Sequence, residues 1–184
     1  EAGRYCTTHL AASNASTGYV NLPDPGSWQL SADAAYVHVC TNETIDGVEF
    51  HTLPDLNALG SKTPLVIDFS SHVASRTVDW SRVGLAFGGA QKNLGPSGVT
   101  LVIIRKDMVE RIPAGLPAML DFRTHIDAQS MYNTPPCYSI YIMKLVLEWV
   151  KNMGRDTLFA RNAEKAALLY DALRYLSHQV DAWR

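Results

Sequence analysis

The sequence lacks an excess of charge, a long apolar run and a regular cysteine pattern. With 16 Lys and Arg against 18 Asp and Glu, its formal net charge is −2, so the strongly basic surface of a nucleic-acid-binding protein is missing. No apolar run approaches the ~20 residues that a membrane-spanning helix requires. The three cysteines, Cys6, Cys40 and Cys137, have neither zinc-site spacing nor the even number typical of a disulfide framework. We therefore expect no nucleic-acid, membrane or metal partner and a reducing, cytoplasmic location.

The two ends of the chain do not resemble those of a complete protein. The sequence begins at Glu1 without an initiator Met and stops at Arg184, directly after a helical pattern. Its 184 residues suit one domain, and no linker rich in Pro, Gly or Ser divides them. We therefore expect an excised or incomplete chain.

Short apolar runs in the middle of the chain predict a β-sheet. They are rich in β-branched or aromatic residues, bounded by turn residues, and cover residues 36–40, 64–68, 83–87 and 99–104. Several are apolar on both alternating faces, which is typical of strands covered on two sides by helices. The predicted fold class is α/β, a three-layer sandwich around a mainly parallel, mixed sheet. The first 35 residues read mostly as loops.

The last fifty residues have helical periodicity. Pro135 and Pro136 suit a helix entrance, and apolar residues recur at helical spacing until Gly154 offers a C-terminal cap. A second helical pattern runs from about residue 156 to residue 179. The chain is therefore expected to end in two helices.

The most unusual local stretch carries one lysine among four glycines, at residues 88–98. It is no phosphate-binding P-loop, because Lys92 follows Gln91 and the next predicted element is a strand. Lys92 instead lies at the carboxyl end of a central strand, where open α/β sheets bind their ligands. That position suits a lysine that forms an imine with a carbonyl compound. The alternative is a surface turn with a solvated lysine.

Asp68 ends the apolar run before it and needs a cation or several donors if it is buried. Pyridoxal phosphate would supply a partner, because a carboxylate keeps its ring nitrogen protonated while a lysine holds its aldehyde. Asp68 and Lys92, at the ends of neighbouring strands, suit opposite ends of one such ring. The alternative is that Asp68 caps a turn or a helix.

Four motifs, in this order and approximate spacing, are similar to those of the phosphoserine aminotransferase family: TNETIDG at 41–47, DFSS at 68–71, GAQKNLGPSG at 89–98 and YNTPP at 132–136. The resemblance runs from about residue 36 to 154 and continues more weakly beyond. It implies the fold type I architecture of pyridoxal 5′-phosphate (PLP) enzymes, with residues 1–154 in the large PLP-binding domain. Residues 155–184 would form a helix that leads to a small domain.

The resemblance also implies roles for single residues. Lys92 matches the lysine that binds the cofactor aldehyde and moves the substrate proton, and Asp68 matches the carboxylate at the pyridine nitrogen. Thr44 matches a residue that hydrogen-bonds the cofactor near its ring, and Gln91 matches a contact to its phosphate.

Asn133 and Thr134 match a pair that reaches the phosphate bound in the other subunit, which implies a homodimer with shared active sites. Their amide, hydroxyl and backbone donors before a helix suit an anion. The alternative is that Thr134 only caps that helix.

By this resemblance, the expected reaction exchanges the amino group of glutamate for the keto group of 3-phosphohydroxypyruvate, giving phosphoserine and 2-oxoglutarate in serine biosynthesis. The family's other substrate contacts are expected outside these 184 residues. Two alternatives stay open. One is another fold type I PLP enzyme, either a different aminotransferase or a desulfurase-like relative. The other is a non-catalytic fragment that only dimerises.

Overall fold

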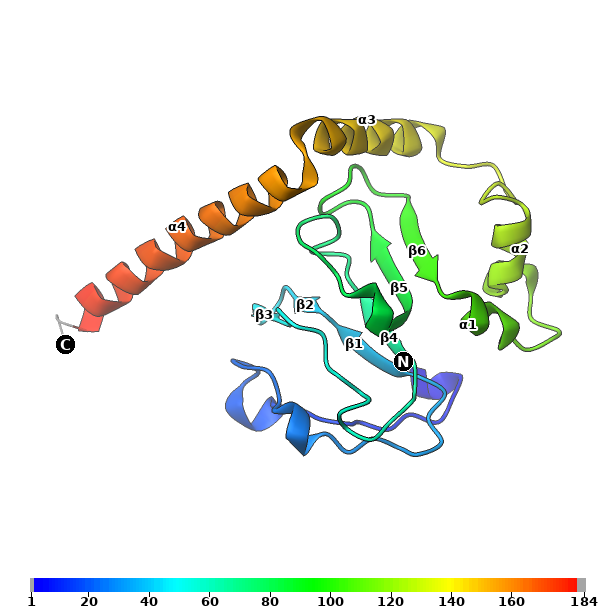
Figure 1. Ribbon diagram of the computed structural model, residues 1–184, viewed down its shortest axis with the longest axis horizontal. Coiled ribbons are helices and arrows are strands. Elements are labelled where there is room, and N and C mark those ends of the chain that lie inside the picture. Colours follow the sequence, from blue (N-terminus) through cyan, green and yellow to red (C-terminus); the bar gives the residue numbers. More distant parts are fainter. Residues whose placement is uncertain (1, 182–184) are drawn as a thin grey trace.

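A computed structural model describes residues 2–181, with side chains to residue 178. Its centre is a four-stranded sheet of order β1-β4-β5-β6, beside a separate two-stranded hairpin, β2-β3 (Figure 1). The strands are β1 (Val37–Cys40), β2 (Asn42–Glu43), β3 (Val48–Glu49), β4 (Leu65–Asp68), β5 (Val83–Gly89) and β6 (Thr100–Ile104). The α-helices are α1 (Lys106–Glu110), α2 (Phe122–Asp127), α3 (Cys137–Met153) and α4 (Arg155–Asp181). The 3-10 helices are η1 (Ala2–Arg4), η2 (Ala15–Thr17), η3 (Pro25–Ser27), η4 (Trp80–Arg82) and η5 (Ala118–Leu120).

The sheet is mixed and mainly parallel, as predicted. Strands β1, β4 and β5 run parallel, so their carboxyl ends meet at one edge, whereas β6 returns antiparallel to β5. The register pairs Val39 with Ile67 and Ile67 with Ala86 across the three parallel strands. Ile67 and Ala86 have no exposed surface. These two side chains therefore form the packed centre of one face of the sheet.

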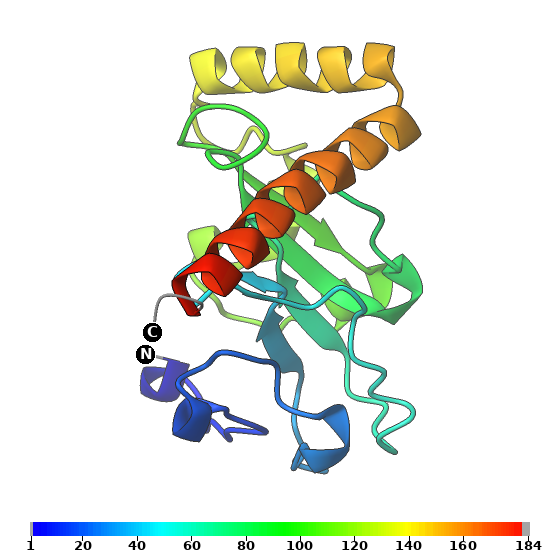
Figure 2. The same cartoon turned by 90° about the vertical axis from the view of Figure 1, so that its left-hand side faces the viewer.

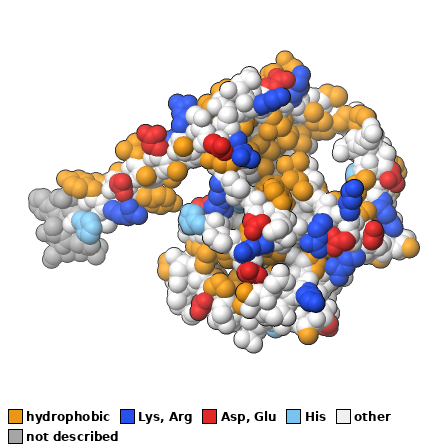
Figure 3. All heavy atoms as spheres, in the orientation of Figure 1, with side chains coloured by type: hydrophobic (Ala, Val, Ile, Leu, Met, Phe, Trp, Pro, Cys, Tyr) orange, Lys and Arg blue, Asp and Glu red, His pale blue; other side chains and the backbone are white. Residues whose placement is uncertain are grey.

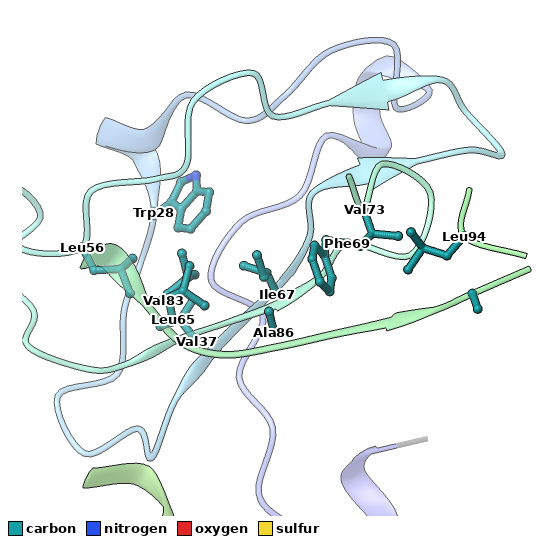
Figure 4. Packing of buried hydrophobic residues seen from close by; sticks show 11 residues of the cluster. Trp28, Val37, Leu56, Leu65, Ile67, Phe69, Val73, Val83, Ala86 and Leu94 are labelled. Atoms are coloured by element: carbon teal, nitrogen blue, oxygen red, sulfur yellow. The ribbon is translucent and has the colours of Figure 1, made fainter. Parts of the chain in front are cut away.

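The core lies on one face of this sheet. Trp28 and Leu56, from the loops before and after the hairpin, pack with strand residues such as Leu65 (Figure 4). Phe69, in the turn after β4, extends the cluster toward Leu94. Burying several such side chains stabilises the fold by roughly 1.5–3 kcal/mol each. The same packing holds the carboxyl ends of β4 and β5 in fixed relative positions.

The apolar run at residues 99–104 forms β6 as predicted, but this strand is not covered on both sides. Val102 and Ile103 are 37% and 38% exposed. The reason is that β6 is the edge strand, paired only with β5. The loop prediction for the start of the chain holds over residues 2–35, apart from 3-10 turns of three residues each.

The two long helices follow the predicted positions; α3 packs on the loop after β5, and α4 extends away from the sheet. Leu158, in the first turn of α4, is buried, and the side-chain amide of Asn162 donates to the carbonyl oxygen of Ser75 at 3.2 Å. Beyond these contacts α4 projects from the body of the molecule (Figure 1) and points toward the viewer in Figure 2. Hydrophobic side chains are visible along it and below α3 (Figure 3), and Leu168 on α4 is 75% exposed. No helix among residues 2–181 combines the length and apolarity needed to span a membrane.

Candidate active site

The carboxyl edge of the three parallel strands gathers the predicted site residues of the first half of the chain. Thr44 lies in the hairpin after β1, Asp68 ends β4, and Lys92 lies in the turn after β5. Parallel strands present such residues at the same edge, which is where α/β sheets bind ligands. The edge therefore brings together groups that are 48 residues apart in the sequence.

Lys92 is held in a turn that is anchored on both sides. Ala90 and Leu94 are buried, and the carbonyl oxygen of Ala90 accepts hydrogen bonds from the amides of Leu94 and Gly95 at 2.8 and 3.0 Å. The Lys92 side chain itself is exposed, and its Nζ donates to Oγ1 of Thr44 at 3.2 Å. The turn thus fixes the backbone of Lys92 and leaves its amine accessible beside one neutral hydroxyl.

The hairpin that carries Thr44 is fastened to the turn after β4. The Ser71 hydroxyl donates to the carbonyl oxygen of Asn42 at 2.7 Å, and the Arg76 guanidinium forms an ion pair with Glu49 of β3. Arg76 also donates to the carbonyl oxygen of Phe50 at 2.8 Å. These contacts position a two-stranded element that is too short to be stable alone.

Asp68 makes its side-chain hydrogen bonds through one oxygen. Its Oδ1 accepts from the amide and the hydroxyl of Ser70 at 2.9 and 2.6 Å. The Ser70 hydroxyl in turn accepts from the amide of Gly89 at 3.1 Å. The turn-capping interpretation of Asp68 is therefore correct for Oδ1. Oδ2 accepts no hydrogen bond from the residues that the structure describes, so Asp68 can still meet a ligand.

Gln91 is exposed at the same edge and folds back over the strand end. A Cβ atom at position 89 would lie 2.5 Å from Oε1 of Gln91, which is closer than any real Cβ contact. A side chain at position 89 would therefore displace the exposed Gln91 side chain from this place. The amide group of Gln91 lies beside the backbone that leads to Lys92.

Asn133 and Thr134 are not brought to this edge by any contact among residues 2–181. Both are exposed in the bend before α3, and the Asn133 side chain donates to the carbonyl oxygen of Thr134 at 3.4 Å. The interpretation of Thr134 as a helix cap is wrong. Helix α3 begins at Cys137 with Pro136 at its N-cap position and no side-chain cap, because the two prolines delay the first helical turn.

Sequence reasoning gave no role to Ser70 or Thr41, which both contact Asp68. The signal for Ser70 is the Asp-x-Ser spacing, since an aspartate commonly accepts a hydrogen bond from the amide two residues on. Thr41 is fully buried, and its hydroxyl lies 3.0 Å from the carbonyl oxygen of Asp68 and 2.6 Å from Nε2 of His72. Nothing in the sequence pattern indicates this second contact.

Two hollows, of about 430 and 500 Å³, lie beside Arg111 and beside Arg76 and Trp80, respectively. Neither is lined by Lys92 or Asp68. Within the described part of the chain, no three His, Cys, Asp or Glu side chains are grouped to hold a metal ion.

The sheet and its polar edge define an α/β ligand-binding domain, and comparisons with known proteins specify it further. Residues 4–180 match the family described as aminotransferase class-V. The chain is 60% identical to a phosphoserine aminotransferase of Albidiferax ferrireducens over 94% of its own length and 47% of that protein. The solved phosphoserine aminotransferase of Bacillus circulans subsp. alkalophilus superposes with a TM-score of 0.86 at 44% identity, covering 93% of this chain and 46% of that one. PLP-bound phosphoserine aminotransferase from Trichomonas vaginalis superposes with a TM-score of 0.76 at 42% identity, over 83% and 44% of the two chains.

The chain belongs to the class-V aminotransferase family. It spans about half the length of the relatives that it matches. The predicted family resemblance and the fold class are both confirmed.

Proposed function

We propose that the protein carrying this chain is a phosphoserine transaminase of serine biosynthesis. The reaction would be 3-phosphohydroxypyruvate and L-glutamate to O-phospho-L-serine and 2-oxoglutarate. The observation that carries this proposal is the contact of Lys92 with Thr44 at the edge that Asp68 also reaches. The shared names of the relatives, at 49–60% identity, support the substrate assignment.

The residues at this edge fit pyridoxal 5′-phosphate by the chemistry of their free groups. Lys92 offers an accessible amine for an aldehyde, and Asp68 offers the carboxylate oxygen Oδ2 for a protonated ring nitrogen. Thr44 and Gln91 offer a hydroxyl and an amide to the polar substituents. When bound, PLP supplies an aldehyde that takes up the amino group and a ring that withdraws electrons from it.

Each residue at this edge would then have a separate role in the reaction. Nζ of Lys92 would remove the proton from the substrate α-carbon as a general base. It would then return a proton, as a general acid, to the carbon of the cofactor aldehyde group. The Thr44 hydroxyl, within hydrogen-bond distance, orients that amine. Oδ2 of Asp68 holds the proton on the ring nitrogen, while Ser70 keeps the carboxylate in one orientation.

We propose further that the protein is a cytoplasmic homodimer. Asn133 and Thr134, exposed and without a contact to Lys92 among the described residues, would reach the cofactor phosphate of the partner subunit. Residues 1–154 would belong to the large PLP-binding domain, and residues 155–184 would lead to a small domain. The projection of α4 away from the sheet supports this division.

The test is to incubate the full natural chain with PLP, reduce it with borohydride, and map the labelled peptide. Label on Lys92, together with transamination of phosphoserine by 2-oxoglutarate, is the expected result. Lys92→Ala should lose both, whereas Lys62→Ala, at an exposed lysine before β4 and so at the opposite edge of the sheet, should lose neither. Label on another lysine would overturn the site, and activity on other amino donors without phosphoserine turnover would overturn the substrate.

A further inference from the structure

His72 and Thr41 form a buried polar pair beside the candidate site. His72 lies in the turn after β4 and is 3% exposed, and Thr41 follows β1 and is fully buried. Nε2 of His72 is 2.6 Å from Oγ1 of Thr41, and the ring packs edge-on against Phe69. Polar groups at such depth are stable only when they are hydrogen-bonded. The pair therefore has a defined arrangement of donors and acceptors.

Counting protons fixes that arrangement. The Thr41 hydroxyl has one proton, and the carbonyl oxygen of Asp68, 3.0 Å away, can only accept it. For both contacts of the Thr41 hydroxyl to be hydrogen bonds, its oxygen accepts from Nε2–H of His72. The other ring nitrogen, Nδ1, is buried and has no hydrogen-bond partner among the described residues. A neutral ring leaves Nδ1 as an unprotonated acceptor, whereas a cationic ring would bury an unpaired N–H there.

The charges around His72 favour this neutral form. Burial and, to a smaller extent, the positive charge of Arg76, four residues on, together lower the pKa of His72 to about 4. Glu49 on β3 and Asp68 on β4 act in the opposite direction with smaller effect. His72 is thus a neutral donor to Thr41 at neutral pH.

Thr41 connects the pair to the backbone of the candidate site. The amide and the hydroxyl of Thr41 both donate to the carbonyl oxygen of Asp68, each at 3.0 Å. Thr41 also starts the hairpin whose tip carries Thr44, the partner of Lys92. Without the hydroxyl contact, the Thr41 amide alone would hold the start of this hairpin on the Asp68 carbonyl.

We propose that His72 is a positioning residue of this site: by donating from Nε2 to Thr41, it fixes the Thr41 hydroxyl on the Asp68 carbonyl and so sets the place of Asp68 relative to Thr44 and Lys92. The relevance of these positions to PLP rests on the proposed function.

Two variants and one control test this role in the full natural chain. His72→Leu fills the space without a donor, whereas His72→Gln can donate from its side-chain amide to the Thr41 oxygen. Ser75→Ala removes the hydroxyl that donates to the His72 carbonyl oxygen at 2.7 Å, and so perturbs the same turn without touching the ring. It separates a general loosening of the turn from the loss of the Nε2 donor.

The first readout is the PLP concentration that gives half-maximal borohydride labelling of Lys92. We expect His72→Leu to raise it about tenfold, and His72→Gln to stay within about threefold of the unmodified protein. Ser75→Ala should leave it unchanged. Unchanged labelling in His72→Leu, or an equal loss in His72→Gln, would contradict the positioning role.

The second readout does not involve the cofactor. Hydrogen exchange of the Thr41 amide, which donates to Asp68, should become about tenfold faster in His72→Leu and stay slow in His72→Gln and Ser75→Ala. Equal protection of this amide in all four proteins would overturn the proposal. If the unmodified protein takes no label on Lys92, the proposed function fails, and the amide exchange alone decides the role of His72.

Discussion

The amide of Gly89 donates to the hydroxyl of Ser70 at 3.1 Å, which joins the end of β5 to the turn after β4. Because the Ser70 oxygen accepts this bond, its own proton is directed to Asp68, 2.6 Å away. One serine hydroxyl thus links the strand end that leads to Lys92 with the carboxylate opposite. Hydrogen bonds to a charged group are stronger than those between neutral groups, so this link is a firm one.

Removing that hydroxyl should impair catalysis more than substrate binding. For Ser70→Ala we expect kcat for phosphoserine transamination to fall about tenfold with little change in KM, because the carboxylate loses its orientation. Steady-state kinetics of the full natural chain would measure this. Asp79 and Ser81 form the same Asp-x-Ser arrangement, at 2.6 Å, in the exposed turn before β5, so Ser81→Ala is the matched control. Equal effects of the two substitutions would contradict the prediction.

Thr44→Val should weaken cofactor binding without weakening the fold. Thr44 is exposed, so the loss of its bond to Lys92 should change the free energy of unfolding by less than about 0.5 kcal/mol. We expect the Kd for PLP, measured by absorbance titration, to rise a few-fold. Thr77→Val, at another exposed threonine, should leave the Kd unchanged. An unchanged Kd in Thr44→Val would mean that the hydroxyl plays no part in the site.

Acid should destabilise the protein through His72. An unfolded histidine takes up a proton near pH 6.5, whereas buried His72 stays neutral down to about pH 4. Its contribution to stability is therefore complete above pH 6.5 and is lost as the pH falls toward 4, with a maximum of about 3 kcal/mol. Urea unfolding at pH 7.5 and 4.5 should show a smaller loss for His72→Gln than for the unmodified protein. Identical losses would show that His72 is not the group that titrates.

The buried middle of the sheet should respond strongly to truncation. Ile67 has no exposed surface, so Ile67→Ala should cost about 2–5 kcal/mol through lost burial and a cavity. Val102 on edge strand β6 is 37% exposed, and Val102→Ala should cost much less. Urea midpoints of both variants would compare the two strands. Similar costs would mean that β6 is covered in the folded protein.

The elements that could be predicted from the sequence are those with a regular apolar pattern. Strand β4 and helix α3 appear within a few residues of their predicted bounds, because apolar residues at period two or at helical spacing define them. The β2-β3 hairpin was not predicted, since two-residue strands carry no periodicity, and its position depends on Ser71 and Arg76. The antiparallel direction of β6 could not be predicted either, because the apolar pattern of a strand does not depend on its direction.

The candidate site likewise contains residues that the sequence pattern indicates and residues that only the structure shows. Lys92 and Asp68 stand out from the local sequence, because a lysine among glycines and an aspartate after an apolar strand are both unusual. Their contact partners Thr44 and Ser70 owe their places to the sheet edge, and the resemblance alone pointed to Thr44. The Thr41–His72 pair depends on two segments 31 residues apart and could be found only in three dimensions.

Helix α3 returns the chain to the loop that follows Lys92. The Ser139 hydroxyl donates to the carbonyl oxygen of Ser97 at 2.9 Å, and the backbone of Met143 would lie 3.4 Å from a Cβ at position 95. The chain between these contacts, including α1 and α2, forms a long loop whose two ends are held together. Doubling the length of such a loop costs only about 0.6 kcal/mol in closure entropy. Relatives can therefore vary in length between β6 and α3, whereas an inserted residue between Gly89 and Gly98 would separate the lysine turn from the helix that braces it.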